Sequence, residues 1–176
     1  MDEIFNTEIQ PKSTDKLNFL RDYFNSFSET PIEKKFLKSR RIDYPDVKYS
    51  YSPTPPFLEL TGRIQFPLTL YPDLIVGVSA RALDDNPLKY ITLIDFDITK
   101  SFFLYGIDKA FNAIRNRGFA IVVEGIIDVL RLNNLGFYNV VAPLGTNLTD
   151  LHLKYLNILT KNIVLMFDGD PAGDLS

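Results

Sequence analysis

The last third of the chain alternates short apolar runs with segments of helical spacing, and this alternation limits the possible folds more than any other feature. The five segments, in order, are residues 120–124, 126–134, 139–142, 149–159 and 162–167. Strands that alternate with crossover helices are typical of parallel sheets, and continuously apolar strands are typical of burial on both faces. The sequence therefore predicts an α/β unit over residues 119–176.

Two of the predicted strands end in carboxylates. Glu124 ends the first, and Asp168 and Asp170 follow the last. The carboxyl ends of parallel strands gather on one edge of a sheet, so we expect these side chains to converge. Unpaired charges beside a core are costly unless cations or hydrogen-bond donors offset them, and Mg²⁺ prefers such oxygen ligands. We therefore predict a metal site of Glu124, Asp168 and Asp170, which Asp128, one helical turn beyond Glu124, can join.

Each of these motifs alone is weak evidence. An Asp-Gly-Asp sequence is more often a turn or a helix cap than a metal site, and a lone Glu-Gly is weaker still. The prediction depends on both motifs following buried-type strands in one α/β unit. Two nearby polar residues stay outside the predicted site. Asp150 is interpreted as a charge at a helix N-terminus, and His152 as an exposed or partly packed helix residue.

The composition excludes several classes of chemistry. The chain has no cysteine, so it has no disulfide bond and no cysteine-ligated zinc, and we expect no zinc in it. A single histidine argues against a histidine-based triad. No apolar run approaches the length of a membrane span, and the amino terminus lacks the layout of a signal peptide. We therefore expect a cytoplasmic protein with no membrane partner, whose chemistry uses carboxylates and cations.

Charge is unevenly distributed along the chain. The net charge of −3 on its own argues against a general nucleic-acid binder. The whole chain has 22 acids and 19 bases; residues 119–176 hold six acids and three bases, which leaves 16 of each in residues 1–118. A bound metal would cancel much of the acidic excess. The bases cluster upstream, notably as Lys34, Lys35, Lys38, Arg40 and Arg41.

The helical and strand patterns of the first 118 residues predict a mixed α+β lobe. We expect residues 1–13 to be loose. Helical spacing, capping residues and a first-turn proline predict three helices, which are residues 14–27, 31–41 and 102–117. Gly118 is expected to end the third helix.

The predicted strands of this lobe form a hairpin. Residues 62–68 and 74–81 have strand character, and a turn at residues 71–73 joins them. The four prolines of residues 44–57 can neither propagate a helix nor donate a full strand ladder, so this stretch is a connector or a sheet edge. Residues 83–99 are expected to be irregular, with a turn at residues 84–87.

Three segments of the α/β unit resemble the Toprim domain of bacterial and phage DnaG-type primases in order and spacing: Ile121 to Leu130, Asn139 to Thr146 and Val164 to Gly173. Other segments are similar to the amino-terminal polymerase lobe of the same enzymes, namely residues 36–42, 62–68, 76–83, 89–90 and 99–106. This coverage separates primases from the topoisomerases, recombination proteins and nucleases that share only the Toprim part.

The resemblance implies a domain division and a fold class. Residues 1–30 would be an amino-terminal helical or loose segment, residues 31–118 the basic polymerase lobe, and residues 119–176 a partial Toprim domain. The fold class would be α/β, an α+β lobe followed by a partial parallel sheet with crossover helices. The family's zinc ribbon, its further downstream acidic pair and its helicase-binding module have no counterpart in this sequence.

The resemblance also implies an activity, the template-directed synthesis of RNA primers on single-stranded DNA by a nucleotidyltransferase of DNA replication. Glu124 would be the acid/base or metal-proximal carboxylate. Asp168 and Asp170 would bind Mg²⁺ or Mn²⁺, and Asp128 would be an accessory acid. The metal ions would align the triphosphate of a ribonucleotide with the primer 3′-hydroxyl and stabilise the pyrophosphate leaving group.

The resemblance further implies a nucleic-acid and nucleotide surface. Four cations match family positions in a cleft, where they contact template or nucleotide phosphates: Arg63, Arg81, Lys89 and Lys100. Tyr90 lies beside Lys89, where an aromatic ring could stack on a base. Expected partners are the single-stranded DNA template, ribonucleoside triphosphates, and a replicative helicase or a second primase polypeptide. A bacterial cytoplasm or a phage-infected host cell is the expected location.

Several alternatives stay open at this point. The chain could be a catalytic fragment, a split primase that needs a second polypeptide, or a non-catalytic DNA- or nucleotide-binding module. A Toprim nuclease or topoisomerase-like enzyme ranks last, because the nine tyrosines offer no distinctive context for a nucleophile.

Overall fold

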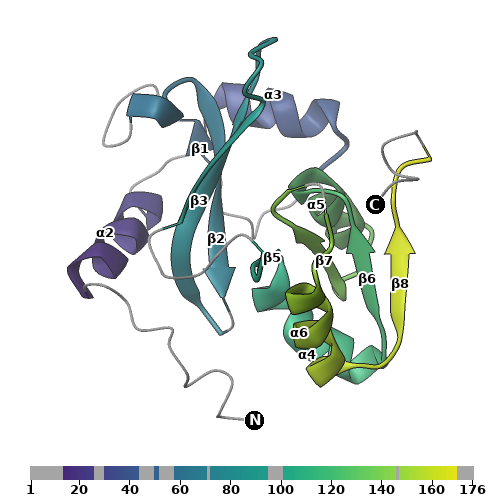
Figure 1. The fold of residues 1–176 in the computed structure, drawn as a ribbon. Coiled ribbons are helices and arrows are strands. Elements are labelled where there is room, and N and C mark those ends of the chain that lie inside the picture. Colours follow the sequence, from purple (N-terminus) through teal and green to yellow (C-terminus); the bar gives the residue numbers. More distant parts are fainter. Residues whose placement is uncertain are drawn as a thin grey trace. The chain divides into compact units, whose positions relative to one another are not determined.

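The computed structural model contains two compact units, each with its own sheet (Figure 1). Unit 1 comprises Met1–Leu68 and Leu74–Ile98, and unit 2 comprises Thr69–Asp73 and Thr99–Ser176. Among the described residues, no helix has the length and apolar character needed to cross a membrane. The structure describes residues 14–25, 30–43, 50–51, 58–70, 72–94, 101–145 and 147–169.

Unit 1 is built on four strands, which are β1 (Ser50–Tyr51), β2 (Arg63–Leu70), β3 (Leu74–Ala82) and β4 (Tyr90–Ile94). They lie in the order β1-β2-β3-β4. β1 pairs antiparallel with β2, and β3 pairs antiparallel with β4 in a register that sets Arg81 opposite Tyr90. The two strands predicted at residues 62–68 and 74–81 are confirmed, and they are hydrogen-bonded neighbours.

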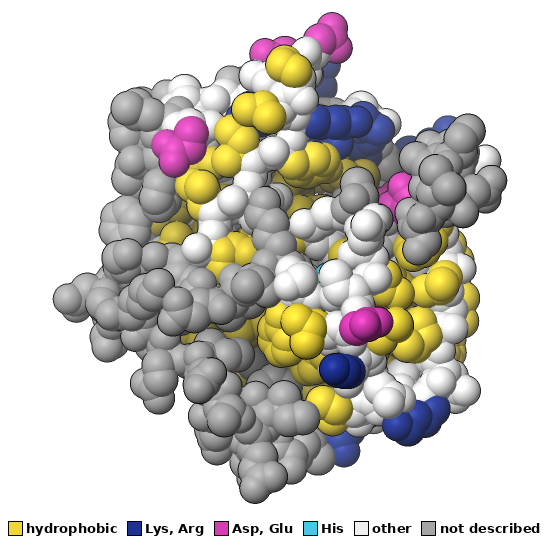
Figure 2. Space-filling view, in the orientation of Figure 1, with side chains coloured by type: hydrophobic (Ala, Val, Ile, Leu, Met, Phe, Trp, Pro, Cys, Tyr) yellow, Lys and Arg dark blue, Asp and Glu magenta, His cyan; other side chains and the backbone are white. Residues whose placement is uncertain are grey.

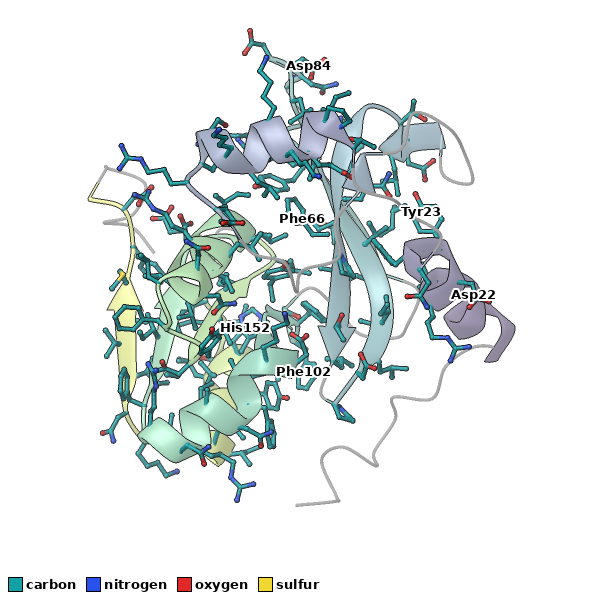
Figure 3. All side chains as sticks on the ribbon, turned by 180° about the vertical axis from the view of Figure 1, so that it is seen from behind. Asp22, Tyr23, Phe66, Asp84, Phe102 and His152 are labelled. Carbon is teal, nitrogen blue, oxygen red and sulfur yellow. The ribbon has the colours of Figure 1, made fainter. Side chains whose placement is uncertain are left out.

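The prediction that residues 83–99 are irregular is wrong for residues 90–94, because these residues form β4. This run is short, and it becomes a strand because five of its residues pair with β3. The turn at residues 84–87 is confirmed, because the chain bends at residues 83–85 and 87 and the Ala82 N–H donates to the Lys89 carbonyl at 2.9 Å across it. At its end Asn86 Oδ1 accepts a hydrogen bond of 2.9 Å from the Leu88 N–H. Asp84 marks the tip of this exposed turn (Figure 3).

Helix α2 (Thr14–Asn25) packs on the sheet of unit 1. Its apolar residues recur at helical spacing, so Tyr23 and Phe24 meet the same buried cluster as Val78 of β3. The Tyr23 hydroxyl donates a hydrogen bond of 2.6 Å to Oε1 of Gln65, which satisfies a polar group inside the core (Figure 3). The predicted start of this helix at residue 14 agrees with α2, whereas its predicted end at residue 27 and the predicted loose residues 1–13 lie outside the described residues.

Helix α3 (Pro31–Ser39) carries the basic cluster. Thr30 and Glu33 form a capping box, in which the Thr30 N–H donates to Glu33 Oε2 at 2.6 Å. The helix ends at Ser39, two residues before the predicted end, because Arg41 takes a left-handed conformation with a φ of 56°. Figure 2 shows Lys and Arg side chains gathered over α3, and the exposed ones are Lys34, Lys35, Lys38, Arg40 and Arg41.

Unit 2 contains four strands, which are β5 (Leu104–Tyr105), β6 (Ala120–Val123), β7 (Val140–Pro143) and β8 (Ile163–Met166). The order is β5-β7-β6-β8. β6 lies between β7 and β8 and is parallel to both, whereas β5 is antiparallel to β7. The predicted α/β fold class with a parallel sheet is confirmed.

Three helices accompany this sheet, α4 (Ile107–Arg117), α5 (Ile126–Asn134) and α6 (Asp150–Leu159). α5 and α6 connect the parallel strands, as predicted. The helix predicted at residues 102–117 starts later, because Leu104 and Tyr105 pair with β7 and Gly106 adopts a φ of 84°. Gly118 ends α4 in a left-handed conformation, as predicted.

The prediction that all strands of the α/β unit are buried on both faces is wrong for β8. β6 and β7 are buried throughout. Val164, Leu165 and Met166 are 44%, 55% and 50% exposed, because β8 is last in the strand order of the described sheet. Apolar character alone therefore did not distinguish a central strand from an edge strand.

The interpretation of His152 as exposed or partly packed is also wrong, because this side chain is buried in unit 2 (Figure 3). Its Nδ1 accepts a hydrogen bond of 3.1 Å from the Thr149 N–H, so the Nε2–H is the atom that donates to the Phe103 carbonyl at 3.1 Å. Thr149 Oγ1 in turn accepts a bond from the His152 N–H. His152 therefore caps α6 and ties it to the segment before β5.

Candidate active site

Glu124 and Asp168 meet beyond the carboxyl ends of two adjacent strands. β6 and β8 are parallel and pair Val123 with Met166, so the residues that follow them emerge on the same edge of the sheet. The Asp168 N–H donates a hydrogen bond of 2.8 Å to Oε1 of Glu124. Glu124 is half-buried and Asp168 is exposed. The convergence predicted from the strand pattern is therefore present for these two carboxylates.

Asp128 joins them from the first turn of α5. Gly125, the residue before this helix, has no side chain to cap it. The Asp128 carboxylate takes that role by accepting a hydrogen bond from the Gly125 N–H. A helix N-terminus has unpaired N–H groups and favours negative charge, so the sequence Glu-Gly-Ile-Ile-Asp places an acid where the backbone stabilises it. The short link from β6 to α5 brings this acid to the same sheet edge.

The three carboxylates influence one another electrostatically. Burial raises the pKa of Asp128 above its ordinary value, and the negative charges of Asp168 and then Glu124 raise it further. The hydrogen bond from Gly125 and the positive charge of Arg131 lower the pKa, but they do not cancel the increase. A proton is therefore held more strongly at Asp128 than at an isolated aspartate.

These residues fit a divalent cation by the chemistry of their donors, which are mutually repelling carboxylate oxygens at one sheet edge. Among the residues that the structure describes, no three acids or histidines are arranged so that one ion could be held by all of them. Asp170, the remaining predicted ligand, lies outside the described residues. The described carboxylates are thus an acidic cluster rather than a complete metal cage.

Three of the four predicted phosphate-binding cations, Arg63, Arg81 and Lys89, lie in unit 1 beside the β3–β4 turn. Arg63 is only 6% exposed, and its Nη1 donates to the carbonyls of Leu88 at 2.7 Å and Lys89 at 3.5 Å. Part of its guanidinium therefore supports the end of this turn. Lys89 is exposed. Lys100 lies outside the described residues.

Arg81 and Tyr90 face each other across the β3–β4 pair. The Arg81 guanidinium carbon lies 5.3 Å from the centre of the Tyr90 ring, and Nη1 donates to the Tyr90 hydroxyl at 2.8 Å. Phe36 of α3 also contacts this guanidinium, with 5.5 Å between the guanidinium carbon and the ring centre. Sequence reasoning missed Phe36, because α3 and β3 are far apart in the chain. The available signals were its position among the basic residues of α3 and the resemblance of residues 36–42 to the polymerase lobe.

Comparison with known proteins agrees with this geometry. A model of the Toprim domain matches residues 118–176. The DNA primase of Staphylococcus aureus (strain COL) is 42% identical over 113 residues, which are 64% of this chain and 19% of the relative. The DNA primase of Staphylococcus epidermidis (strain ATCC 12228 / FDA PCI 1200) is 40% identical over 118 residues. The chain thus spans about a fifth of the length of these curated relatives.

Solved primase structures share the fold. The Aquifex aeolicus primase, with its zinc-binding and RNA polymerase domains, has 29% sequence identity and a TM-score of 0.77 over 90% of this chain and 48% of that one. The E. coli primase catalytic core, at 22% identity, has a TM-score of 0.73 over 89% of this chain and 62% of that one. Sequence and fold are therefore both similar to those of DnaG-type primases, over part of their catalytic core. The acidic cluster lies within the residues that match the Toprim domain.

Proposed function

We propose that this chain takes part in the template-directed synthesis of RNA primers on single-stranded DNA. The observation that carries the proposal is the meeting of Glu124, Asp128 and Asp168 at one sheet edge within the Toprim-matched residues. The relatives named as DNA primases support the same reaction. One similar structure, the RNA polymerase domain of Mycobacterium tuberculosis primase, is in complex with double-stranded DNA that has a 6-nucleotide overhang.

The carboxylates would act on the growing primer end. Glu124 has one oxygen fixed by the Asp168 N–H, which orients its carboxylate. In this proposal Glu124 accepts the proton of the primer 3′-hydroxyl while the 3′-oxygen forms a bond to the α-phosphorus and pyrophosphate departs. Asp128 and Asp168 provide the negative surroundings that keep a cation near the reacting phosphate. Fixing Glu124 beforehand reduces the reorganisation that the reaction requires.

The proposed cofactor is Mg²⁺ or Mn²⁺, and the candidate ligands are Glu124, Asp128, Asp168 and Asp170. Mg²⁺ commonly uses one or two carboxylates and completes its shell with waters and substrate phosphates, so a preformed three-carboxylate cage is not required. When bound, the ion would neutralise charge on the transferring phosphoryl group and on the leaving pyrophosphate.

The basic surface of unit 1 would hold the template or nucleotide phosphates. Arg63, Arg81 and Lys89 are its proposed phosphate contacts, and Tyr90 is the proposed stacking residue. Arg63 also orders the turn that carries Lys89. Lys100, which is part of unit 2 and lies outside the described residues, is a further proposed phosphate contact. A replicative helicase or a second primase polypeptide is a proposed further partner. The proposed location is the bacterial cytoplasm, and a phage origin stays a prediction. The division at residues 30/31 and 118/119 is likewise proposed as the functional domain division.

A ribonucleotide-incorporation assay on a primed single-stranded template tests the reaction, with Mg²⁺ or Mn²⁺ present. Glu124→Gln and Asp168→Asn remove charge with little change in size, and we expect each to reduce incorporation by about 100-fold or more. Asp150→Asn is the matched control, because Asp150 is an exposed acid of the same unit at the start of α6. Incorporation that survives both site substitutions would disprove the carboxylate assignment.

Metal binding is measured separately from activity. Electron paramagnetic resonance of Mn²⁺ detects bound ion without turnover, and we expect weaker binding in Asp168→Asn than in Asp150→Asn. A chain that binds single-stranded DNA and Mn²⁺ but incorporates nucleotides only after a second polypeptide is added would favour the split-enzyme alternative. A chain that binds single-stranded DNA but does not bind Mn²⁺ would favour the non-catalytic binding module.

A further inference from the structure

Arg81 is held between two aromatic rings that come from different elements of unit 1. The centre of the Phe36 ring, on α3, lies 5.5 Å from the guanidinium carbon, and the centre of the Tyr90 ring, on β4, lies 5.3 Å from it. The Tyr90 hydroxyl accepts from Nη1 at 2.8 Å. Long arginine side chains usually sample many rotamers, so two ring contacts and a hydrogen bond fix this group in one plane.

Nη2 is the donor group of this guanidinium that is left for a ligand, because it has no hydrogen bond to the described residues and is not among the buried unpaired atoms. Nη1 is bonded to Tyr90, while Nε is shielded from water and has no hydrogen-bond partner among the described residues. No carboxylate of the described residues forms an ion pair with Arg81. A planar guanidinium with unused donors matches two oxygens of a phosphate group, which a lysine cannot match in the same way.

The surroundings favour an anion at this place. Lys38, Arg40 and Arg41 are exposed on and after α3, and Arg40 itself lies 5.7 Å from the Phe36 ring centre. Lys89 precedes Tyr90 and is also exposed. The acids nearest to these residues in sequence are Glu33, Asp43, Asp84 and Asp85. Glu33 is buried and accepts a hydrogen bond from the Thr30 N–H, Asp43 follows α3, and Asp84 and Asp85 lie at the tip of the β3–β4 turn.

We infer that Phe36 is a positioning residue for DNA binding: together with Tyr90 it presents the Arg81 guanidinium to a phosphate of the single-stranded template. This inference rests on the proposed function, which assigns Arg81 and Tyr90 to the nucleic-acid surface and assigns no role to Phe36. Phe36 acts through Arg81 rather than on the substrate. A ring at position 36 is needed for this role, and general apolar packing is not sufficient.

A second arginine–phenylalanine contact in the protein provides the matched control. Arg117 lies 5.9 Å from the ring centre of Phe137 in unit 2. Its Nη1 donates to Asn139 Oδ1 at 2.9 Å and its Nη2 to the Gly136 carbonyl at 3.0 Å, so its fork is directed to the protein. Loss of the Phe137 ring should therefore weaken a similar contact without affecting a phosphate site.

The experiment measures the affinity for a fluorescein-labelled oligothymidylate of about 16 nucleotides by anisotropy over a series of salt concentrations. We expect Phe36→Leu to weaken binding about threefold or more and Arg81→Lys about tenfold, while Phe36→Tyr and Phe137→Leu stay close to the unchanged protein. Arg81→Lys should also reduce the slope of log affinity against log salt by up to about one unit, if the lysine no longer reaches the phosphate. Thermal unfolding of each variant identifies any loss of folded protein.

The double variant Phe36→Leu/Arg81→Lys separates positioning from packing. If Phe36 acts through Arg81, the double variant should bind about as weakly as Arg81→Lys alone, whereas independent effects would multiply. Phe36→Leu with unchanged DNA affinity, or an effect equal to that of Phe137→Leu, would overturn the inference and leave the proposed function intact. No binding of single-stranded DNA by the unchanged protein would overturn both. Loss of nucleotide incorporation in Glu124→Gln with normal DNA affinity would support the proposed function independently of Phe36.

Discussion

The Asp168 N–H and the Glu124 carboxylate are joined by a hydrogen bond of 2.8 Å, so the backbone after β8 holds the side chain that follows β6. Glu124→Gln keeps an oxygen acceptor at this position, whereas Glu124→Ala does not. We expect Glu124→Ala to lower the free energy of unfolding by about 1 kcal/mol relative to Glu124→Gln. Urea denaturation followed by circular dichroism measures the difference. Equal stabilities of the two variants would show that the bond contributes nothing to folding.

Arg41 is an unusual residue for the position that it occupies. It follows α3 with a φ of 56°, and the Ile42 N–H donates to the Leu37 carbonyl at 2.9 Å, as in a Schellman motif. We expect Arg41→Gly to raise the free energy of unfolding by about 1 kcal/mol, because glycine adopts this conformation without steric cost. Arg40→Gly is the control, since Arg40 has a φ of −94° and should gain nothing. Chemical denaturation compares both variants.

Two glycines with nearly equal φ angles differ in the space around them. A Cβ added to Gly106 would lie 2.9 Å from Val129 Cγ1 and 3.1 Å from the Val140 carbonyl oxygen, whereas a Cβ added to Gly118 would meet nothing within 4 Å. We expect Gly118→Ala to destabilise the protein by about 1 kcal/mol through strain alone. Gly106→Ala adds overpacking and should cost about 1 to 3 kcal/mol more. Thermal and urea unfolding of both variants test this order, which equal losses would contradict.

Asp108 makes the stability of the folded protein depend on pH in the acid range. Burial raises the pKa of this half-buried carboxyl above its ordinary value of 3.8, and the charge of Asp73 adds to the effect. Between the ordinary and the raised pKa the folded state binds more protons than the unfolded state, so stability falls as the pH rises through this window. Asp108→Asn removes that loss. We therefore expect its stability advantage over the unchanged protein to grow from about pH 4 to about pH 7.

The control for this prediction is Asp150→Asn. Asp150 is an exposed acid in the first turn of α6, where its negative charge favours the helix. Neutralising it should lower the stability at neutral pH by about 0.5 kcal/mol, which is the opposite sign. Urea denaturation at the two pH values distinguishes the cases, and an advantage of Asp108→Asn that shrinks toward neutral pH would contradict the assignment.

Local signals predicted the parallel part of the fold because each element carried its own pattern. The apolar runs of β6 and β7, the capping residue Thr149 and the left-handed Gly118 all act within a few residues of the structure they specify. β4 and β5 had no such pattern. Both are short, and both become strands because a longer strand, β3 or β7, provides the hydrogen-bonding partner.

In the candidate site, too, local patterns could be read from the sequence, whereas contacts between distant elements could not. Glu124 and Asp168 could be placed together from the strand order alone, because parallel topology determines where their side chains emerge. Phe36 could not be connected to Arg81, because their contact depends on how α3 packs against the sheet. The burial of His152 was misjudged for the same reason, and the contacts of Arg63 with the β3–β4 turn could not be predicted. A sequence shows that a side chain is polar, but it does not show which group it bonds. Only the packed structure reveals that His152 donates to the Phe103 carbonyl and Arg63 to the Leu88 carbonyl.

The two carboxylates joined by the hydrogen bond follow strands with different numbers of neighbours. In the described sheet Asp168 follows the outermost strand, whereas Glu124 follows a strand with neighbours on both sides. Edge strands fray at a lower free-energy cost than central ones, so Asp168 can detach while Glu124 stays in place. Substrate or metal that bridges the two carboxylates would then slow hydrogen exchange along β8. We therefore expect occupancy of the two carboxylates and protection of the β8 backbone from exchange to rise together.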